Sequence, residues 1–143
     1  MWGCTDVIRE QVRFDSLQFT GDASMVVERL LQQATTTPDR HAEQAWDLLS
    51  AAHIVGQTSL GLHFRVHWHM LLFGIQTRDT RETAGQLFRL ALVPLGHLLQ
   101  RLPLGNSGRA NVSAFRPMPV APRLSALISA AQVTADQTVF KKR

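Results

Sequence analysis

The chain is organised around two neighbouring segments, AHIVGQ at residues 52–57 and LHFRVHWHM at residues 62–70, which together hold four of its six histidines. The first segment is typical of a helix end, because it continues an apolar stripe and Gly56 can close the helix as a left-handed C-cap. The second segment belongs to a new helix that starts near Leu60. A helical hairpin with a short turn is therefore predicted here.

The segments on either side of this hairpin also repeat their apolar residues with helical spacing. We predict helices from Ala23 to the threonines before Pro38, from Pro38 to about Val55, from Leu60 to about Gln76, from Asp79 to about Leu99 and from Pro122 to about Val133. Thr37 is the expected N-cap of the second helix, with Pro38 in its first turn. Asp79 and Glu82 have the spacing of a capping box. Pro94 is expected to bend or break the fourth helix, which carries Leu87, Leu90, Ala91, Leu95, Leu98 and Leu99.

Short turns between these helices predict an all-α fold, a small antiparallel bundle of two helical hairpins. The hairpins resemble tetratricopeptide units in length and in their small residues, although an array of such units needs about three of them. Residues 103–119 carry two glycines and three prolines and are expected to form a long ordered loop on the bundle. We assign 1–22 to an irregular N-terminal arm, 23–133 to a single helical domain and 134–143 to a polar basic tail.

The composition narrows the classes of function. The formal charge of +4 is dispersed, and no basic stripe is interleaved with exposed aromatic residues, so we expect no nucleic-acid partner. The longest mainly apolar run, residues 87–99, is too short and too interrupted for a membrane span. One cysteine, Cys4, cannot form an internal disulfide, and the N-terminus lacks the pattern of a secretory signal. A soluble cytoplasmic protein is the simplest expectation.

Three motifs resemble a small bacterial family that is known only as a domain of unknown function. They are AHxxGQ at 52–57, HxxVHWxM at 63–70 and GNSGxANVSAFxPMP at 105–119. The resemblance covers roughly residues 46–124 and implies a single-domain helical protein without an assigned activity. Family members tend to carry a glutamate three residues before the first histidine, where this chain has Ser50, so a carboxylate ligand at that position would be missing here.

The histidines are the candidate site. His63 and His67 are spaced i, i+4 and share one helix face with Met70, and an antiparallel hairpin would bring His53 toward His63. Two or three imidazoles and a thioether would suit Zn, Ni or Cu, with Asp47 or Glu43 as a further ligand if the packing allows. These four residues, His53, His63, His67 and Met70, are the predicted metal ligands. His69, His41 and His97 are left out, because they lie on other faces or far along the chain.

Other chemistry is not supported by the sequence. The spacing of His63 and His67 lacks the glutamate of a metalloprotease motif, residues 105–108 do not follow the phosphate-binding pattern, and no nucleophile, base and orienting group come together. A tight turn held by the Asn106 and Asn111 side chains is favoured for the loop. Two hypotheses remain open: a transition-metal protein, and a tetratricopeptide-like interaction module with structural histidines and an unknown protein partner. Trp46 and Trp68 are predicted to be core residues.

Overall fold

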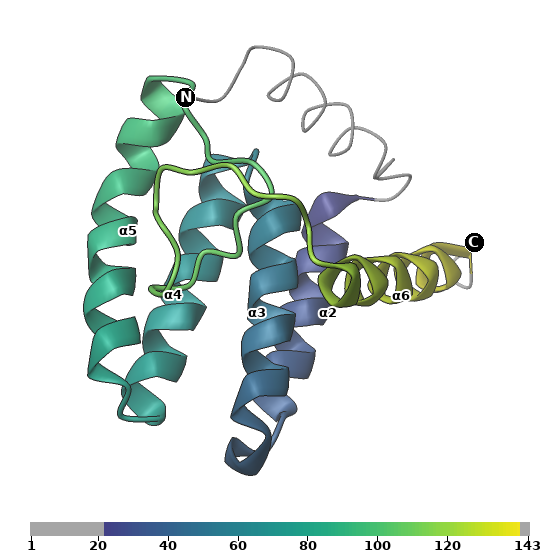
Figure 1. The fold of residues 1–143 in the computed structure, drawn as a ribbon. Helices are drawn as coiled ribbons and strands as arrows, with labels where there is room; N and C mark the ends of the chain where they lie inside the picture. Colours follow the sequence, from purple (N-terminus) through teal and green to yellow (C-terminus); the bar gives the residue numbers. More distant parts are fainter. Residues whose placement is uncertain (1–21, 141–143) are drawn as a thin grey trace.

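The computed structural model describes residues 22–140, and in that part of the chain every regular element is helical (Figure 1). The helices are α2 (Ala23–Thr36), α3 (Ala42–Gly56), α4 (Leu60–Gln76), α5 (Thr80–Leu98) and α6 (Pro122–Phe140), with a 3-10 turn η1 (Asp39–His41) before α3. The predicted all-α class is confirmed. The predicted N-terminal arm lies almost wholly outside the described residues.

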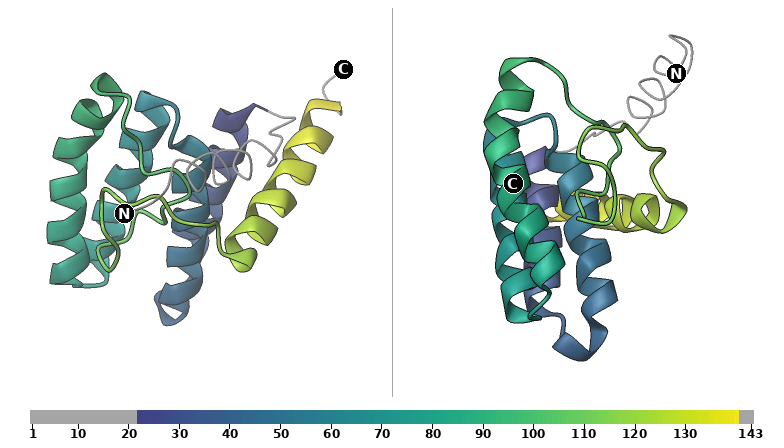
Figure 2. Two further views of the ribbon diagram at one scale, coloured as in Figure 1. Left: turned by 45° about the horizontal axis from the view of Figure 1, so that its top comes forward. Right: turned by 60° about the vertical axis from the view of Figure 1, so that its left-hand side comes forward.

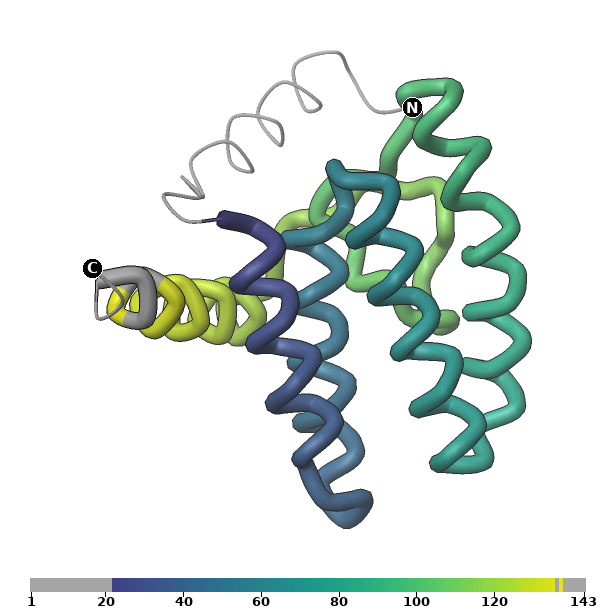
Figure 3. The backbone as a smooth tube through the Cα atoms, turned by 180° about the vertical axis from the view of Figure 1, so that it is seen from behind, coloured from purple at the N-terminus to yellow at the C-terminus, as the bar shows by residue number. Residues whose placement is uncertain are grey.

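The two predicted hairpins are present. Helix α2 packs on α3, α4 packs on α5, and α3 joins the two pairs through its contacts with α4. Helix α6 crosses α2 and α3 at a steep angle, and α5 lies at the opposite end of the molecule (Figures 1 and 2). The view from behind shows α2 and α4 in front, with the long connection between α5 and α6 on the far side (Figure 3). The likeness to tetratricopeptide units stays a prediction.

The core lies between α2, α3, α4 and α6, and it follows the apolar periodicity of the sequence. Val26, Val27, Leu30, Leu31 and Ala34 of α2 are all buried, as that pattern predicts. Leu124, Ile128 and Ala131 of α6 close the core from the other side. None of the helices in the described range is long and apolar enough to cross a membrane.

Several helix ends differ from the prediction. Helix α3 begins at Ala42 and not at Pro38, because Pro38 caps the 3-10 turn that precedes it and Thr37 instead ends α2. Helix α5 continues through Pro94 to Leu98, and α6 extends past Val133 to Phe140, into the predicted polar tail. The N-cap half of the capping-box prediction is confirmed, since the Asp79 carboxylate accepts a hydrogen bond from the Glu82 amide at 2.9 Å. The reciprocal bond is absent, because the Asp79 amide donates to the Gly74 carbonyl instead.

Helix α5 turns its polar face inward, contrary to its apolar pattern. Glu82, Gln86, Arg89 and Val93 are its buried residues. Leu87, Leu95, Leu98 and Leu99 are about half exposed or more, with Leu98 79% exposed. Trp68 on α4 is also half exposed, because the face that buries Val66 and His67 directs the next residue outward. A buried polar helix face needs partners, and those partners define the candidate site.

Candidate metal centre

Three helices bring four histidines together. His53 lies near the end of α3, His63 and His67 lie on one face of α4, and His97 lies near the end of α5. The short turn between α3 and α4 makes the two helices antiparallel, so His53 stands opposite the i, i+4 pair. His53, His63 and His67 are at most 4% exposed. The predicted convergence of these three residues is therefore present in the fold.

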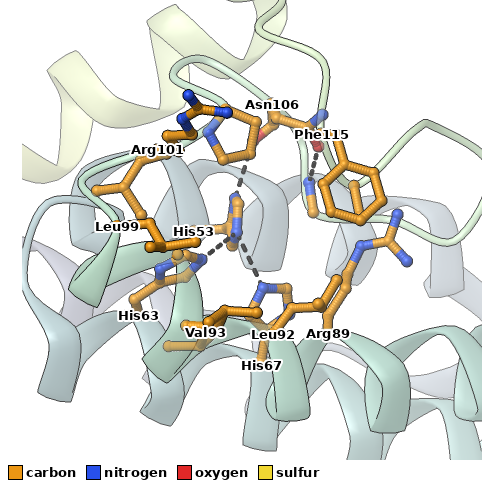
Figure 4. A pocket seen from close by; sticks show the side chains of 16 residues that line it. His53, His63, His67, Arg89, Leu92, Val93, Leu99, Arg101, Asn106 and Phe115 are labelled. Atoms are coloured by element: carbon orange, nitrogen blue, oxygen red, sulfur yellow. Dashed lines mark hydrogen bonds between the residues drawn. The ribbon is translucent and has the colours of Figure 1, made fainter.

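The Nε2 atoms of His53, His63 and His67 face one another at the centre of the cluster (Figure 4). His53 Nε2 lies 3.0 Å from His63 Nε2 and 3.1 Å from His67 Nε2. One ligand nitrogen from each of the three rings lies within 4.8 Å of the other two. Within the described residues this is the group of side chains that could hold a metal ion.

The Nδ1 atom of each ring contacts a polar group on the opposite side. His53 Nδ1 lies 2.8 Å from the backbone carbonyl oxygen of Asn106, and His67 Nδ1 lies 2.7 Å from Gln86 Oε1. His63 Nδ1 lies 3.1 Å from Nε2 of the partly buried His97. Each imidazole is thus held from behind by a hydrogen-bonding group, the arrangement that orients histidine ligands in metal proteins.

These contacts fix the tautomers of two rings. A carbonyl oxygen can only accept, so His53 Nδ1 carries the hydrogen and its Nε2 carries a lone pair. Gln86 donates through Nε2 to the Gly108 carbonyl at 3.0 Å, which turns its Oε1 toward His67. His67 Nδ1 therefore donates as well, and its Nε2 also carries a lone pair.

Burial keeps the three imidazoles neutral. Desolvation, followed by the nearby His67 and His63, lowers the pKa of His53 well below its ordinary value. Burial, followed by His67 and His97, lowers the pKa of His63 to about 3. Burial is also the largest cause at His67, whose pKa falls to about 4. Neutral imidazoles are the form that binds metal ions, so these rings need not lose a proton first.

The loop after α5 forms one wall of the site, and buried amides anchor it. The Gln57 side chain, fully buried at the end of α3, donates to the Pro103 carbonyl at 2.6 Å and accepts from the Gly105 amide at 3.1 Å. Asn106 accepts from the Gly108 amide at 2.9 Å and donates to the carbonyls of Ser113 and Arg116, each at 2.8 Å. The predicted turn is therefore held by Asn106, while Asn111 is exposed.

Two glycines allow the loop to approach closely. Gly105 and Gly108 have φ angles of 73° and 76°, a region that favours glycine. A Cβ on Gly105 would lie 2.0 Å from the Met118 carbonyl oxygen. Gly56 does not take the left-handed conformation that the sequence suggested, and is instead the last residue of α3, where a Cβ would lie 3.2 Å from that of Leu62.

The buried polar face of α5 holds the other end of the loop. The Glu82 carboxylate accepts from Arg109 Nε and from the Ala110 amide, both at 2.9 Å. The Arg89 guanidinium donates to the carbonyls of Arg109 and Val112, at 2.7 and 2.6 Å. The Glu82 carboxylate thus binds the loop and not the start of its own helix, a role that its position in the sequence does not reveal.

A cavity of about 260 Å³ opens beside the histidines. The rings of His53, His63 and His67 form part of its wall, and most of the remaining surface is apolar. The apolar residues that line it are Leu92, Val93, Leu95, Leu99, Leu102, Pro103, Ala114 and Phe115. Arg89 and Arg101 also line it, and Figure 4 draws them on different sides of the histidines.

The other candidate residues have different surroundings. Met70 is fully buried in the apolar core cluster and is not among the residues that line the cavity. Asp47 pairs with Arg123 at 3.0 Å, and Glu43 is an exposed partner of Arg109. His97, which the sequence analysis left out, contacts His63. Its position 34 residues further along the chain gave no signal, because that contact depends on which face of α5 turns inward.

The chain matches the model of a known protein family. The family model described as "Protein of unknown function (DUF3703)" matches residues 22–128, which include all four histidines of the site and the loop that covers it. No curated protein sequence and no solved structure matches the chain.

Proposed function

The chain belongs to the DUF3703 family, and we propose that this member binds one transition-metal ion through the Nε2 atoms of His53, His63 and His67. The i, i+4 pair of His63 and His67 and the neighbouring His53 would supply three nitrogen ligands. Zn²⁺ is the first ion to test, with Ni²⁺ and Cu²⁺ as the other candidates, because imidazole nitrogen suits all three.

The contact between His53 Nε2 and His67 Nε2 carries the proposal. Both atoms have lone pairs in the neutral rings, because both Nδ1 atoms donate to oxygen acceptors, yet they lie 3.1 Å apart. Without a hydrogen between them this contact is unfavourable. A proton would relieve it but would place a charge in a buried site, which the lowered pKa values oppose. A metal ion would accept both lone pairs and keep both outer hydrogen bonds.

The spacing fits a metal ion with little adjustment. A tetrahedral Zn²⁺ with Zn–N bonds of about 2.0–2.1 Å places its ligand nitrogens about 3.3 Å apart. The two contacts of His53 Nε2, 3.0 and 3.1 Å, are slightly shorter, so small ring rotations would reach that value. The polar groups of Asn106, Gln86 and His97 lie on the side of each ring away from the ion, as the orienting groups of metal sites do.

Elemental analysis of the protein purified without chelator tests the proposal, followed by titration of Zn²⁺, Ni²⁺ and Cu²⁺ into chelator-treated protein by calorimetry. We expect about one ion per chain, lost in the His63→Ala/His67→Ala double variant. The His69→Ala variant is the matched control, because His69 is on the same helix but outside the cluster. Circular dichroism checks the fold, and His63→Gln/His67→Gln replaces the alanine variant if that one unfolds. Full metal affinity in a folded double variant would refute the site.

The interaction-module hypothesis has less support. Its partner would use a groove between the hairpins, but the chain's own loop bonds to Gln57, His53 and Gln86 beside the histidines. A partner would therefore have to bind elsewhere on the surface. The hypothesis stays a prediction, and no contact in the fold favours it over metal binding.

A further inference from the structure

The histidine cluster offers a metal ion three protein ligands within the described chain. Structural zinc sites have four protein ligands, whereas sites that act on a bound molecule keep one position for water or that molecule. Met70 packs in the apolar core, and His97 contacts the Nδ1 side of His63, opposite to the nitrogen that would face the ion. Neither residue is placed to supply the fourth ligand.

The three rings also line the cavity, so the remaining position faces that space. The cavity is formed mainly by aliphatic side chains of α5 and by Phe115 of the loop. Its volume of about 260 Å³ exceeds the roughly 150 Å³ that accommodates benzene in an apolar protein cavity. A small apolar body therefore fits beside the ion.

The charges around the cavity favour an anion. A divalent ion bound by three neutral imidazoles keeps its full double charge. Arg89 and Arg101 add positive charge, and none of the lining residues in the described chain carries a carboxylate. The nearest buried acid on α5, Glu82, already accepts hydrogen bonds from Arg109 and from Ala110. A ligand that brings one negative charge would offset this excess, and a second cation would increase it.

We propose that the fourth position of the metal ion takes a small monoanion with an apolar body, and that a short-chain carboxylate is the simplest ligand of this class. The carboxylate binds the ion, and the hydrocarbon chain fills the cavity between α5 and the loop. This inference rests on the proposed metal function. It adds a ligand class and a second set of residues, Val93, Leu92 and Phe115, which contact the ligand's body and not the ion.

Cobalt(II) provides the probe, because its visible absorption changes when a ligand enters its coordination shell. The full chain is loaded with Co²⁺ and titrated with acetate, butyrate and hexanoate, and separately with butyramide, the uncharged analogue of butyrate. We expect the carboxylates to change the spectrum, with affinity rising up to about fourfold for each added CH₂ group that the cavity buries. Butyramide should bind at least tenfold more weakly than butyrate.

The Val93→Phe variant fills the cavity from α5, and we expect it to bind Co²⁺ as before but to lose the dependence on chain length. Leu98→Phe is the matched control, because Leu98 is on the same helix, 79% exposed and outside the cavity. Ala114→Leu narrows the cavity from the loop side if Val93→Phe does not fold. Absence of Co²⁺ binding in the unmodified chain would refute the metal site itself. A bound Co²⁺ whose spectrum no carboxylate changes, or an affinity independent of chain length, would refute the ligand class and leave the metal site standing.

Discussion

Gly108 packs its backbone against the imidazole of His53, so closely that a Cβ on Gly108 would lie 2.8 Å from the ring atoms Cγ and Cδ2. The same residue has a φ angle of 76° and offers its carbonyl to the Gln86 side chain. The glycine therefore connects two of the three rings: it contacts His53 directly and it fixes the amide that orients His67. The loop motif and the histidine motif are parts of one site.

This contact predicts that Gly108→Ala weakens both the fold and metal binding. The added methyl group must displace the loop or the His53 ring, and alanine is strained at this φ angle, at a cost of about 1–3 kcal/mol. Urea unfolding and zinc calorimetry measure the two effects. Gly61→Ala is the control, because no atom lies within 4 Å of its Cβ position. Equal metal affinity in both variants would contradict the role assigned to Gly108.

The amide of Gln86 should matter for metal affinity although it does not touch the ion. Gln86→Met keeps the length of the side chain but removes the acceptor of His67 Nδ1. We expect Zn²⁺ affinity to fall about 10- to 100-fold, the usual cost of losing a group that orients a ligand. Gln44→Met, at an exposed position of α3, should leave the affinity unchanged. Calorimetry on both variants measures the difference. Unchanged Zn²⁺ affinity for Gln86→Met would show that Gln86 does not orient His67 for metal binding.

His97 is predicted to orient His63 in the same way. His97→Ala removes the group at His63 Nδ1, and we expect a loss of about tenfold in Zn²⁺ affinity, at the lower end of the usual range, because water can reach this partly buried position. His97→Gln restores a hydrogen-bond acceptor and should recover part of the loss. His69→Ala again serves as the control. A larger loss for His69→Ala than for His97→Ala would show that the assignment is wrong.

The sequence was sufficient to predict the elements that depend on local spacing. The i, i+4 pair of His63 and His67, the short turn before it and the Asp79 cap of α5 all follow from neighbouring residues. These features predict that an antiparallel hairpin brings His53 toward His63. They also predicted the separate helical hairpins, because each apolar stripe needs an adjacent helix to cover it.

What the sequence could not provide were the features that depend on tertiary partners. Helix α5 has an apolar pattern that predicts the opposite face inward, yet Glu82, Gln86 and Arg89 are buried, because Arg109, His67 and the loop carbonyls satisfy them. Since the rotation of α5 was not predictable, His97 was missed. The sequence predicts that Gly56 is a left-handed C-cap, whereas the structure requires a glycine there because Leu62 approaches closely across the turn.

Acid should destabilise the metal-free protein through the same histidines. In the folded chain the pKa of His63 is about 3 and that of His67 about 4, against 6.5 for an unperturbed imidazole. Below pH 6.5 the unfolded chain therefore binds protons that the folded chain does not, so the free energy of unfolding falls as the pH falls. The slope approaches about 1.4 kcal/mol per pH unit for each histidine until the pH nears its folded pKa.

Urea unfolding of chelator-treated protein between about pH 7.5 and about pH 5 measures this slope before the carboxyl groups titrate. The His63→Gln/His67→Gln variant is the control and should show a smaller decrease, because glutamine takes up no proton in this range. Zn²⁺ at about 100 times its dissociation constant should add about 2.7 kcal/mol to the unmodified chain and little to the variant. A free energy of unfolding that stays constant between these pH values would mean that the rings take up protons as readily in the folded chain as in the unfolded one, and the argument from their facing lone pairs would then lose its basis.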